Sequence, residues 1–208
     1  MTVDADLPKN AAYWIGELAS TEVGDVRWRE AIEALRGLGH AAIPMLIEAL
    51  GHEKPSVYIG AGNALTRMGA TAFYDVRESL KHDNDRVRRN AALLFYGPAL
   101  REDGLVVEAV SALIEALGDP DPDVRMWSAV ALERIGEEAR EAVPALLVVL
   151  DDEDSYNREW AAHALGSIGL AALEGIPKLT ELLIDDEPSV RSAASHAIDR
   201  ICWAKDEI

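Results

Sequence analysis

Apolar residues recur along this chain at intervals of three and four, the spacing that places side chains on one face of an α-helix. One clear stripe consists of Val124, Ser128, Ala131, Leu132 and Ile135. No stretch shows the strict alternation of apolar and polar residues that is typical of a strand. The pattern therefore predicts an all-α protein.

The helical pattern repeats at a fixed period in the second half of the chain. Arg125 leads into the segment 131–136, and Arg158 leads into the similar segment 164–169, 33 residues later. Another 33 residues bring Arg191 and the segment 197–201. A period of this size is typical of a solenoid, in which each repeat packs only against its neighbours.

Two anchor positions extend the repeat toward the N-terminus. One is a leucine that ends the first helix of each unit, and the other lies eight residues later, at the start of the second helix. The pairs are Leu50/Tyr58, Leu80/Arg88, Leu117/Arg125, Leu150/Arg158 and Leu183/Arg191, and a looser first copy carries Leu18 and Trp28. The chain is thus predicted to be one repeat domain over 1–208, with units at about 1–39, 40–69, 70–99, 100–136, 137–169 and 170–208.

The longest connection between units, at 97–109, lies in the middle of the predicted array. Pro98 stands where other units have isoleucine, so the second helix of the third unit is expected to end early. The connection could serve as a hinge, as a binding loop or as a tolerated insertion, and the sequence leaves these alternatives open.

Helix ends carry recognisable stop and start signals. Gly39, Gly69, Gly136 and Gly169 follow the last apolar residue of a helix and are expected to terminate it. Asn84, Asp121 and Asp154 stand where an N-cap acceptor is needed, and prolines fall in first turns, where the missing donor costs little.

Charge is spread unevenly over the 208 residues, whose formal net charge is −17. Residues 1–104 carry 15 acids and 12 bases, whereas residues 105–208 carry 22 acids and 8 bases. An acidic surface disfavours nucleic acid and anionic membranes and favours a partner with a basic patch, although it also simply keeps a protein in solution. No apolar run is long enough to span a bilayer, and the single cysteine, Cys202, excludes an intramolecular disulfide.

The repeated pattern resembles the HEAT-repeat family. Its elements are Pro-x-Leu-Leu-x-x-Leu, an acidic turn, Val-Arg and Ala-Leu-x-x-Ile-Gly, and they are similar to the bacterial HEAT-like repeats of phycobilisome lyases. The resemblance implies an α-solenoid with first helices on the convex side and second helices on the concave side. Concave surfaces in this family usually bind proteins, but the motif itself specifies fold rather than function.

Four regularly spaced arginines, each beside an acidic turn, form the most visible charged ladder. They are Arg88, Arg125, Arg158 and Arg191, preceded by Asp85, Asp123, Asp154 and Asp186. Such a ladder could cradle phosphate, but in HEAT-like repeats these pairs fasten neighbouring units together. We expect the structural role.

Subtraction of these scaffold positions leaves the residues that face out of the second helices. Arginine, methionine and aromatic residues are enriched in interface cores. The predicted binding residues are Arg29, Arg86, Arg89, Leu93, Tyr96, Met126, Trp127, Val130, Tyr156, Trp160, His163 and His196. Trp127 and Trp160 are equivalent and could instead fill space between units.

His163 and His196 are also equivalent, and with Glu159 and Asp199 nearby they could bind a metal. Two histidines without a clustered third ligand are weak evidence, so no metal is predicted. The sequence contains no Gly-rich phosphate loop or nucleophile elbow, and no cofactor is predicted.

The sequence thus predicts a cytoplasmic, bacterial, non-enzymatic, right-handed α-solenoid that binds a protein or peptide, with no nucleic-acid or membrane partner. An alternative is a phycobilin-lyase-like chromophore-binding enzyme or chaperone, in which Arg29, Arg86 and Arg89 would hold the propionates of a bilin. A HEAT-like DNA glycosylase is less favoured, because that fold needs a basic groove.

Overall fold

The computed structural model describes residues 10–97 and 105–206, with side chains to Trp203. Within these ranges the regular structure is helical and no strand occurs, which confirms the all-α prediction. The part of the connection at 98–104 lies outside the described residues. None of the helices in these ranges is both long and apolar enough to cross a membrane.

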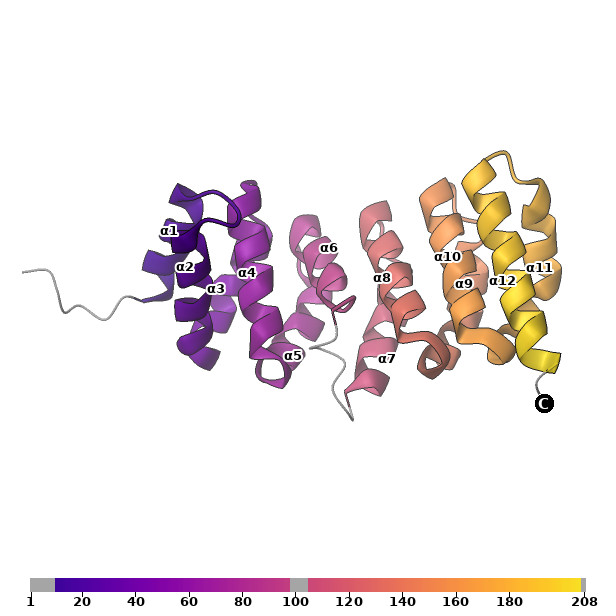
Figure 1. Cartoon of the computed structure of the whole chain (residues 1–208), viewed down its shortest axis with the longest axis horizontal. Helices are drawn as coiled ribbons and strands as arrows, with labels where there is room; N and C mark the ends of the chain where they lie inside the picture. The colour runs from indigo at the N-terminus through magenta and orange to yellow at the C-terminus, as the bar shows by residue number, and fades with distance from the viewer. Residues whose placement is uncertain (1–9, 98–104, 207–208) are drawn as a thin grey trace, which may run out of the picture. The chain divides into compact units, whose positions relative to one another are not determined.

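The chain divides into two compact units, an N-terminal unit of residues 1–94 and a C-terminal unit of residues 95–208. In each unit, successive pairs of antiparallel helices stack as the short segments of an α-solenoid (Figure 1). The division into six repeats of one domain stays a prediction.

The N-terminal unit contains three helical pairs, in which the second helices are α2, α4 and α6 (Figure 1). α6 ends at Leu94, earlier than its counterparts, as the sequence predicted. The elements are α1 (Ala11–Ser20), α2 (Val26–Gly37), η1 (Gly39–Ala42), α3 (Ile43–Leu50), α4 (Pro55–Met68), α5 (Ala70–Glu78), η2 (Ser79–Lys81) and α6 (Asp85–Leu94).

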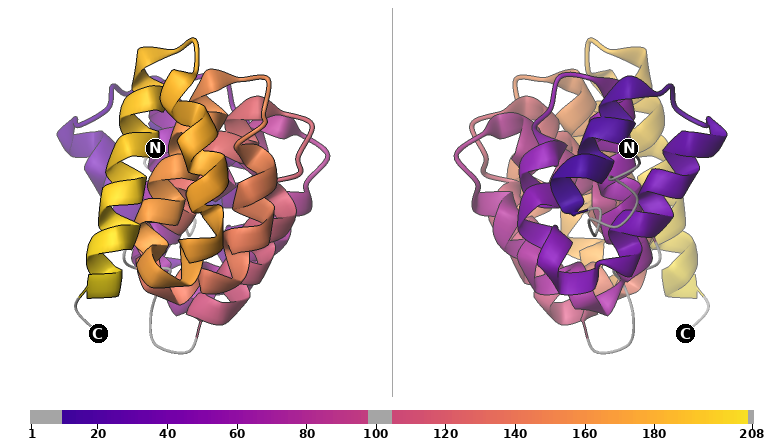
Figure 2. Two further views of the ribbon diagram at one scale, coloured as in Figure 1. Left: turned by 90° about the vertical axis from the view of Figure 1, so that its right-hand side faces the viewer. Right: turned by 90° about the vertical axis from the view of Figure 1, so that its left-hand side faces the viewer.

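In the C-terminal unit the second helices α8, α10 and α12 pack side by side, and the first helices lie behind them (Figures 1 and 2). Gly166 allows α10 to approach α12 closely, because a Cβ there would lie only 2.9 Å from the Cα of Ala197. The elements are α7 (Val106–Ala116), α8 (Pro122–Ile135), η4 (Gly136–Ala142), α9 (Val143–Val149), α10 (Ser155–Ile168), η5 (Gly169–Gly175), α11 (Ile176–Glu181), η6 (Leu182–Ile184) and α12 (Pro188–Asp206).

The predicted caps and stops are present. The Asp121 carboxylate accepts from the backbone N–H groups of Asp123 and Val124, and the Asp154 carboxylate accepts from that of Tyr156. Asn84 accepts from the Arg86 N–H. All four predicted stop glycines have positive φ, between 55° at Gly69 and 74° at Gly136, a conformation that strains other residues.

Arginine–aspartate pairs fasten successive repeats in the C-terminal unit, as the sequence predicted, but the acids differ from those expected. Arg125 donates from Nε and Nη2 to both oxygens of Asp152, at 2.7 and 2.9 Å, and Arg158 bonds Asp185 in the same way at 2.9 and 2.9 Å. The acid belongs to the turn of the next repeat, whereas Asp154, one of the expected acids, caps α10. We call this bidentate arrangement the inter-repeat clamp.

Each clamp arginine also holds its own turn. Nη1 of Arg125 donates to the carbonyls of Asp119 and Pro120, at 2.9 and 3.2 Å. Nη1 of Arg158 does the same for Asp152 and Glu153. One guanidinium therefore orders a turn of its own repeat and binds the turn of the next, using the several donors that only arginine offers.

The clamp shifts the pKa of both aspartates downward. At Asp152 burial opposes the charged form, but hydrogen bonds from Arg125, the Asp154 N–H and the Asn157 amide together hold the pKa below its usual range. At Asp185 the hydrogen bond from Arg158 is the main cause of the lowered pKa. Because the folded-state pKa is the lower one, each carboxylate stabilises the fold near neutral pH and loses this effect as the pH falls through that value.

Replacement of Arg125 by lysine tests the bidentate geometry of the clamp. Lysine keeps the charge but presents one compact ammonium, which cannot bond Asp152 and two turn carbonyls together. We expect Arg125→Lys to lower the free energy of unfolding by about 2 kcal/mol in urea denaturation followed by circular dichroism. The exposed Arg140 of η4 supplies the control. Arg140→Lys should change the free energy of unfolding by less than about 0.5 kcal/mol. Equal losses in both variants would contradict a role for the clamp geometry.

Candidate functional site

A shallow apolar groove of 180 Å³ lies between the second helices α4 and α6 of the N-terminal unit. Ile59 and Gly62 line it from α4, and Leu93 and Leu94 line it from α6, while Leu50 contributes from α3. Tyr58, Asn63, Thr66 and Asn90 complete its wall. We call it the α4–α6 groove. It combines apolar side chains with a few polar groups, as ligand sites commonly do.

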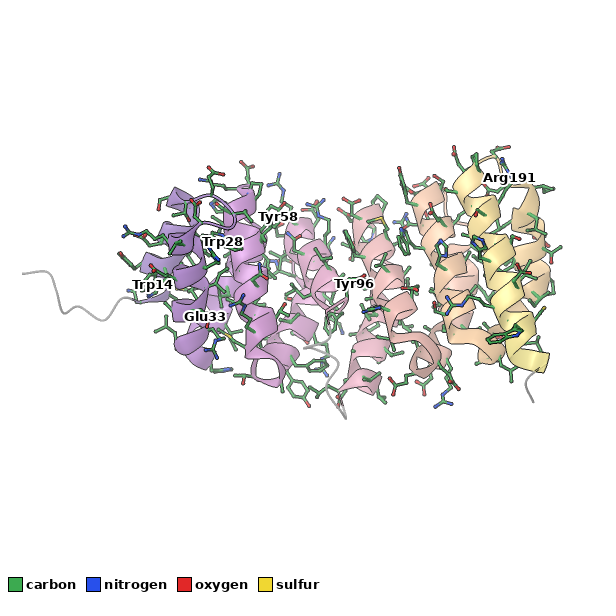
Figure 3. The ribbon with its side chains drawn as sticks, viewed as in Figure 1. Trp14, Trp28, Glu33, Tyr58, Tyr96 and Arg191 are labelled. Atoms are coloured by element: carbon green, nitrogen blue, oxygen red, sulfur yellow. The ribbon has the colours of Figure 1, made fainter. Side chains whose placement is uncertain are left out.

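An open polar pocket of 540 Å³ adjoins the groove, because Asn90 and Tyr58, which is labelled in Figure 3, line both. Its other lining residues are His52, Glu53, Arg86 and Arg89, and we call it the arginine pocket. Nη1 of Arg86 lies 3.6 Å from a carboxylate oxygen of Glu53, whose side chain is 88% exposed. An exposed pair of this kind contributes little and does not commit Arg86 to that partner.

Two asparagines span the groove and have different roles. The Asn90 amide donates to the Leu50 carbonyl at the end of α3, at 2.8 Å, where the helix itself provides no donor. The Asn63 amide donates only to the Ile59 carbonyl of its own helix, at 3.0 Å. Asn90 therefore ties α6 to α3, whereas the carbonyl oxygen of Asn63 is free to face a bound chain.

The structure brings together three of the predicted binding residues, Arg86, Arg89 and Leu93, at this site. Arg29 lies apart from them on α2, where it is exposed and its Nε donates to the Asp25 carbonyl at 3.4 Å. Arg29 therefore does not line the arginine pocket, and the expected three-arginine cluster is reduced to two.

Glu33 of α2, labelled in Figure 3, pairs with two further arginines of this face. It binds Arg36 at 2.9 Å and also pairs with Arg67 of α4. Hydrogen bonds from Arg36 and then Arg67 hold the pKa of Glu33 below its usual range. Glu33 therefore offsets part of the positive charge of Arg36 and Arg67.

Six predicted residues lie along the second helices of the C-terminal unit: Met126, Trp127, Tyr156, Trp160, His163 and His196. All six are at least partly exposed. The ring centroids of Trp160 and His163 are 5.4 Å apart, and His163 and His196 share an open pocket of 420 Å³ with Gly166, Ala197, Asp199 and Arg200. This histidine pocket is the second candidate surface.

The structure changes the interpretation of two predicted binding residues, Val130 and Tyr96. Val130 is only 3% exposed, because the close packing of neighbouring helices covers it, so it belongs to the core and is not a binding residue. Tyr96 is exposed and belongs to the C-terminal unit, where Arg134 lies 5.6 Å from its ring centroid.

Among the described residues, no group of three or more histidine, cysteine, aspartate or glutamate side chains is arranged to hold a metal ion. His163 and His196 are therefore a pair without a third clustered ligand. The histidine pocket supplies hydrogen-bonding and stacking groups.

Sequence analysis missed His52, Tyr58 and Asn90 as site residues. Tyr58 was assigned only the role of a repeat anchor. The sequence did contain a signal that Asn90 is a site residue, because it occupies the position at which the later repeats carry the predicted binding residues Trp127 and Trp160. His52 lies in a turn, and only the structure places it beside α6.

The sequence profile of HEAT repeats matches residues 6–95 and 110–199. The chain therefore belongs to the HEAT-repeat family. No curated protein matches it.

Several solved structures share the fold. The CpcE–CpcF complex of phycocyanin lyase from Nostoc is similar with a TM-score of 0.64 and 24% identity, over 76% of this chain and 98% of that chain. An engineered protein matches with a TM-score of 0.61 and 21% identity, over 93% and 97%. A designed armadillo repeat protein in complex with the peptide (KR)4 matches with a TM-score of 0.60 and 16% identity, over 95% and 100%. At these identities the likeness shows the fold alone.

The two asparagines of the groove provide a matched test of the site's construction. Asn90→Ala leaves the Leu50 carbonyl without its donor, so we expect the free energy of unfolding to fall by about 1–2 kcal/mol. Asn63→Ala removes only a bond to the Ile59 carbonyl, which already accepts a hydrogen bond within α4. This variant should change the free energy of unfolding by less than about 0.5 kcal/mol. Urea denaturation measures both, and a larger loss for Asn63→Ala would contradict the assigned roles.

Proposed function

We propose that this protein is a binding scaffold that holds a peptide or protein segment on the face formed by its second helices. The fold is that of HEAT and armadillo repeats, which generally serve as protein-binding scaffolds. The observation that carries the proposal is the α4–α6 groove with its adjoining arginine pocket. A bound segment would place an apolar side chain in the groove and polar groups against Asn63 and the arginines.

The designed armadillo repeat protein in complex with the peptide (KR)4 supports the kind of ligand, a peptide. The acidic excess of residues 105–208 would steer a ligand with a basic region by long-range attraction. The same charge disfavours nucleic acid as the partner. We propose a binding role and not a catalytic one, because the candidate surfaces combine an apolar groove with polar pockets in the way that recognition sites do.

A phycobilin-lyase-like protein is the second candidate, and the arginine pocket is the observation that favours it. Arg86 and Arg89 are the groups that would meet the propionates of a linear tetrapyrrole. Titration with a bilin, followed by visible absorbance, separates the two candidates. An absorbance change that Arg86→Ala removes would favour the chromophore-binding protein.

Selection from a displayed random-peptide library on the full chain tests the scaffold proposal. The affinity of a selected peptide is then measured by isothermal titration calorimetry. Leu93→Asp places a charge in the α4–α6 groove, and we expect it to weaken binding at least about tenfold, which is 1.4 kcal/mol.

Val148 of α9 supplies the matched control, because it is also an exposed apolar residue but lies on a first helix. Val148→Asp should leave the affinity within about twofold of the unchanged protein. Failure to select any peptide, or loss of binding only in Val148→Asp, would overturn the proposed site.

A further inference from the structure

The inter-repeat clamp follows a positional rule. Each acid that receives an arginine stands six residues before the arginine of its own repeat, as Asp152 stands before Arg158 and Asp185 before Arg191. Each arginine uses Nη1 for its own turn and its Nε–Nη2 edge for the acid of the next repeat. A repeat therefore presents an acid to the repeat before it and a guanidinium edge to the repeat after it.

In the helical pair of α11 and α12, the guanidinium edge of Arg191 bonds no acid among the described residues. Nη1 of Arg191 donates to the carbonyls of Asp185 and Asp186, at 2.6 and 3.0 Å, as its counterparts do to theirs. Within the described part of the chain, no carboxylate takes the position that Asp152 and Asp185 take for the preceding arginines. Figure 3 shows Arg191 near the start of α12.

Apolar side chains beside Arg191 are also uncovered. Leu183 is 39% exposed, whereas the equivalent Leu117 and Leu150 are 4% and 1% exposed because the following repeat covers them. Ile184, the next residue, is 86% exposed. The far end of α12 does not reach this surface, because Asp206 lies 15 residues from Arg191 along the helix, about 22 Å at 1.5 Å per residue.

The first helical pair presents the complementary half. Glu22 stands six residues before Trp28, the anchor of its repeat, as the clamp acids stand before their arginines, in a turn that is two residues longer. It is exposed, and its turn is fixed by the bond from its own N–H to the Asp25 carboxylate at 3.1 Å. Val23 and Val26 beside it are 48% and 65% exposed.

We propose that copies of this chain associate head to tail, with the guanidinium edge of Arg191 bound to Glu22 of the next copy. Leu183 and Ile184 pack against Val23 and Val26 of that copy, so that the contact continues the rule that joins repeats within the C-terminal unit. The association is heterologous, because it joins two different surfaces, and it therefore propagates beyond a dimer.

The distribution of charge favours this orientation over a contact between two C-terminal ends. Residues 105–208 carry 14 more acids than bases, whereas residues 1–104 carry only 3 more. A head-to-tail contact places the strongly acidic half of one copy against the nearly neutral half of the next. Repulsion between the acidic halves disfavours the symmetric alternative.

Sedimentation velocity of the full chain over about 10 μM to 1 mM at low ionic strength is the test, since ion pairs at exposed surfaces are screened by salt. We expect the mean sedimentation coefficient to rise with concentration and to return toward the monomer value in about 0.5 M NaCl. A monomer at every concentration would overturn the proposal.

Charge-reversed variants identify the contact. Arg191→Glu and Glu22→Arg should each remain monomeric alone, whereas an equimolar mixture should associate again, because unlike copies can form both the reversed pair and the original Arg191–Glu22 pair. Circular dichroism melts show whether each variant is folded, and the mixture provides a gain of association that misfolding cannot imitate. Undiminished self-association in both variants, or no complex in the mixture of folded variants, would overturn the assignment of Arg191 and Glu22.

Discussion

The bidentate clamp between an arginine and the turn aspartate of the next repeat is the interaction on which the C-terminal unit depends. The buried contacts between repeats are mostly between small and aliphatic side chains such as Ala161 and Leu165, and such apolar contacts are not directional. The clamp fixes their register with two directional bonds at each interface. It is also largely shielded from water, with side-chain exposures of 16% for Arg158 and 8% for Asp185. Loss of one partner therefore costs more than loss of an ordinary surface pair.

The N-terminal unit joins its repeats by other means. Trp28 donates from its indole nitrogen to the Ser56 carbonyl at 2.7 Å, and the Ser56 hydroxyl donates to the Leu18 carbonyl at 2.7 Å. Here the first two anchors are Trp28 and Tyr58 in place of arginine, and the positions six residues before Tyr58 and Arg88 hold His52 and His82 in place of an acid. Because these turns carry no clamp, His52 and Tyr58 are available to line the arginine pocket beside α6. The candidate site thus lies where the repeat departs from its own rule.

The sequence predicted the scaffold well because local chemistry determines it. The apolar stripes, the N-cap residues Asp121 and Asp154 and the stop glycines Gly136 and Gly169 act within one turn of their own helix, and all have the predicted roles. The prediction of the clamp acids was wrong. Asp123 and Asp154 lie close to Arg125 and Arg158 in the sequence, whereas the observed partners, Asp152 and Asp185, lie across the interface in the next repeat.

The candidate site was predicted less completely, because exposure depends on neighbouring helices. Periodicity placed Val130 on an outward row, but it cannot show how closely adjacent second helices pack, and Val130 is buried. The pairing of Arg67 of α4 with Glu33 of α2 likewise joins two helices and has no local signal. Arg86, Arg89 and Leu93 were found because one short helix, α6, carries all three.

A double-mutant cycle at Arg158 and Asp185 tests the central claim most directly. The free energies of unfolding of Arg158→Ala, Asp185→Ala and the double variant, from urea denaturation, give the coupling between the two side chains. A clamp that holds two repeats together predicts a coupling of about 2–3 kcal/mol. A coupling below about 0.5 kcal/mol would mean that the pair is no more than a surface contact, and would contradict the account.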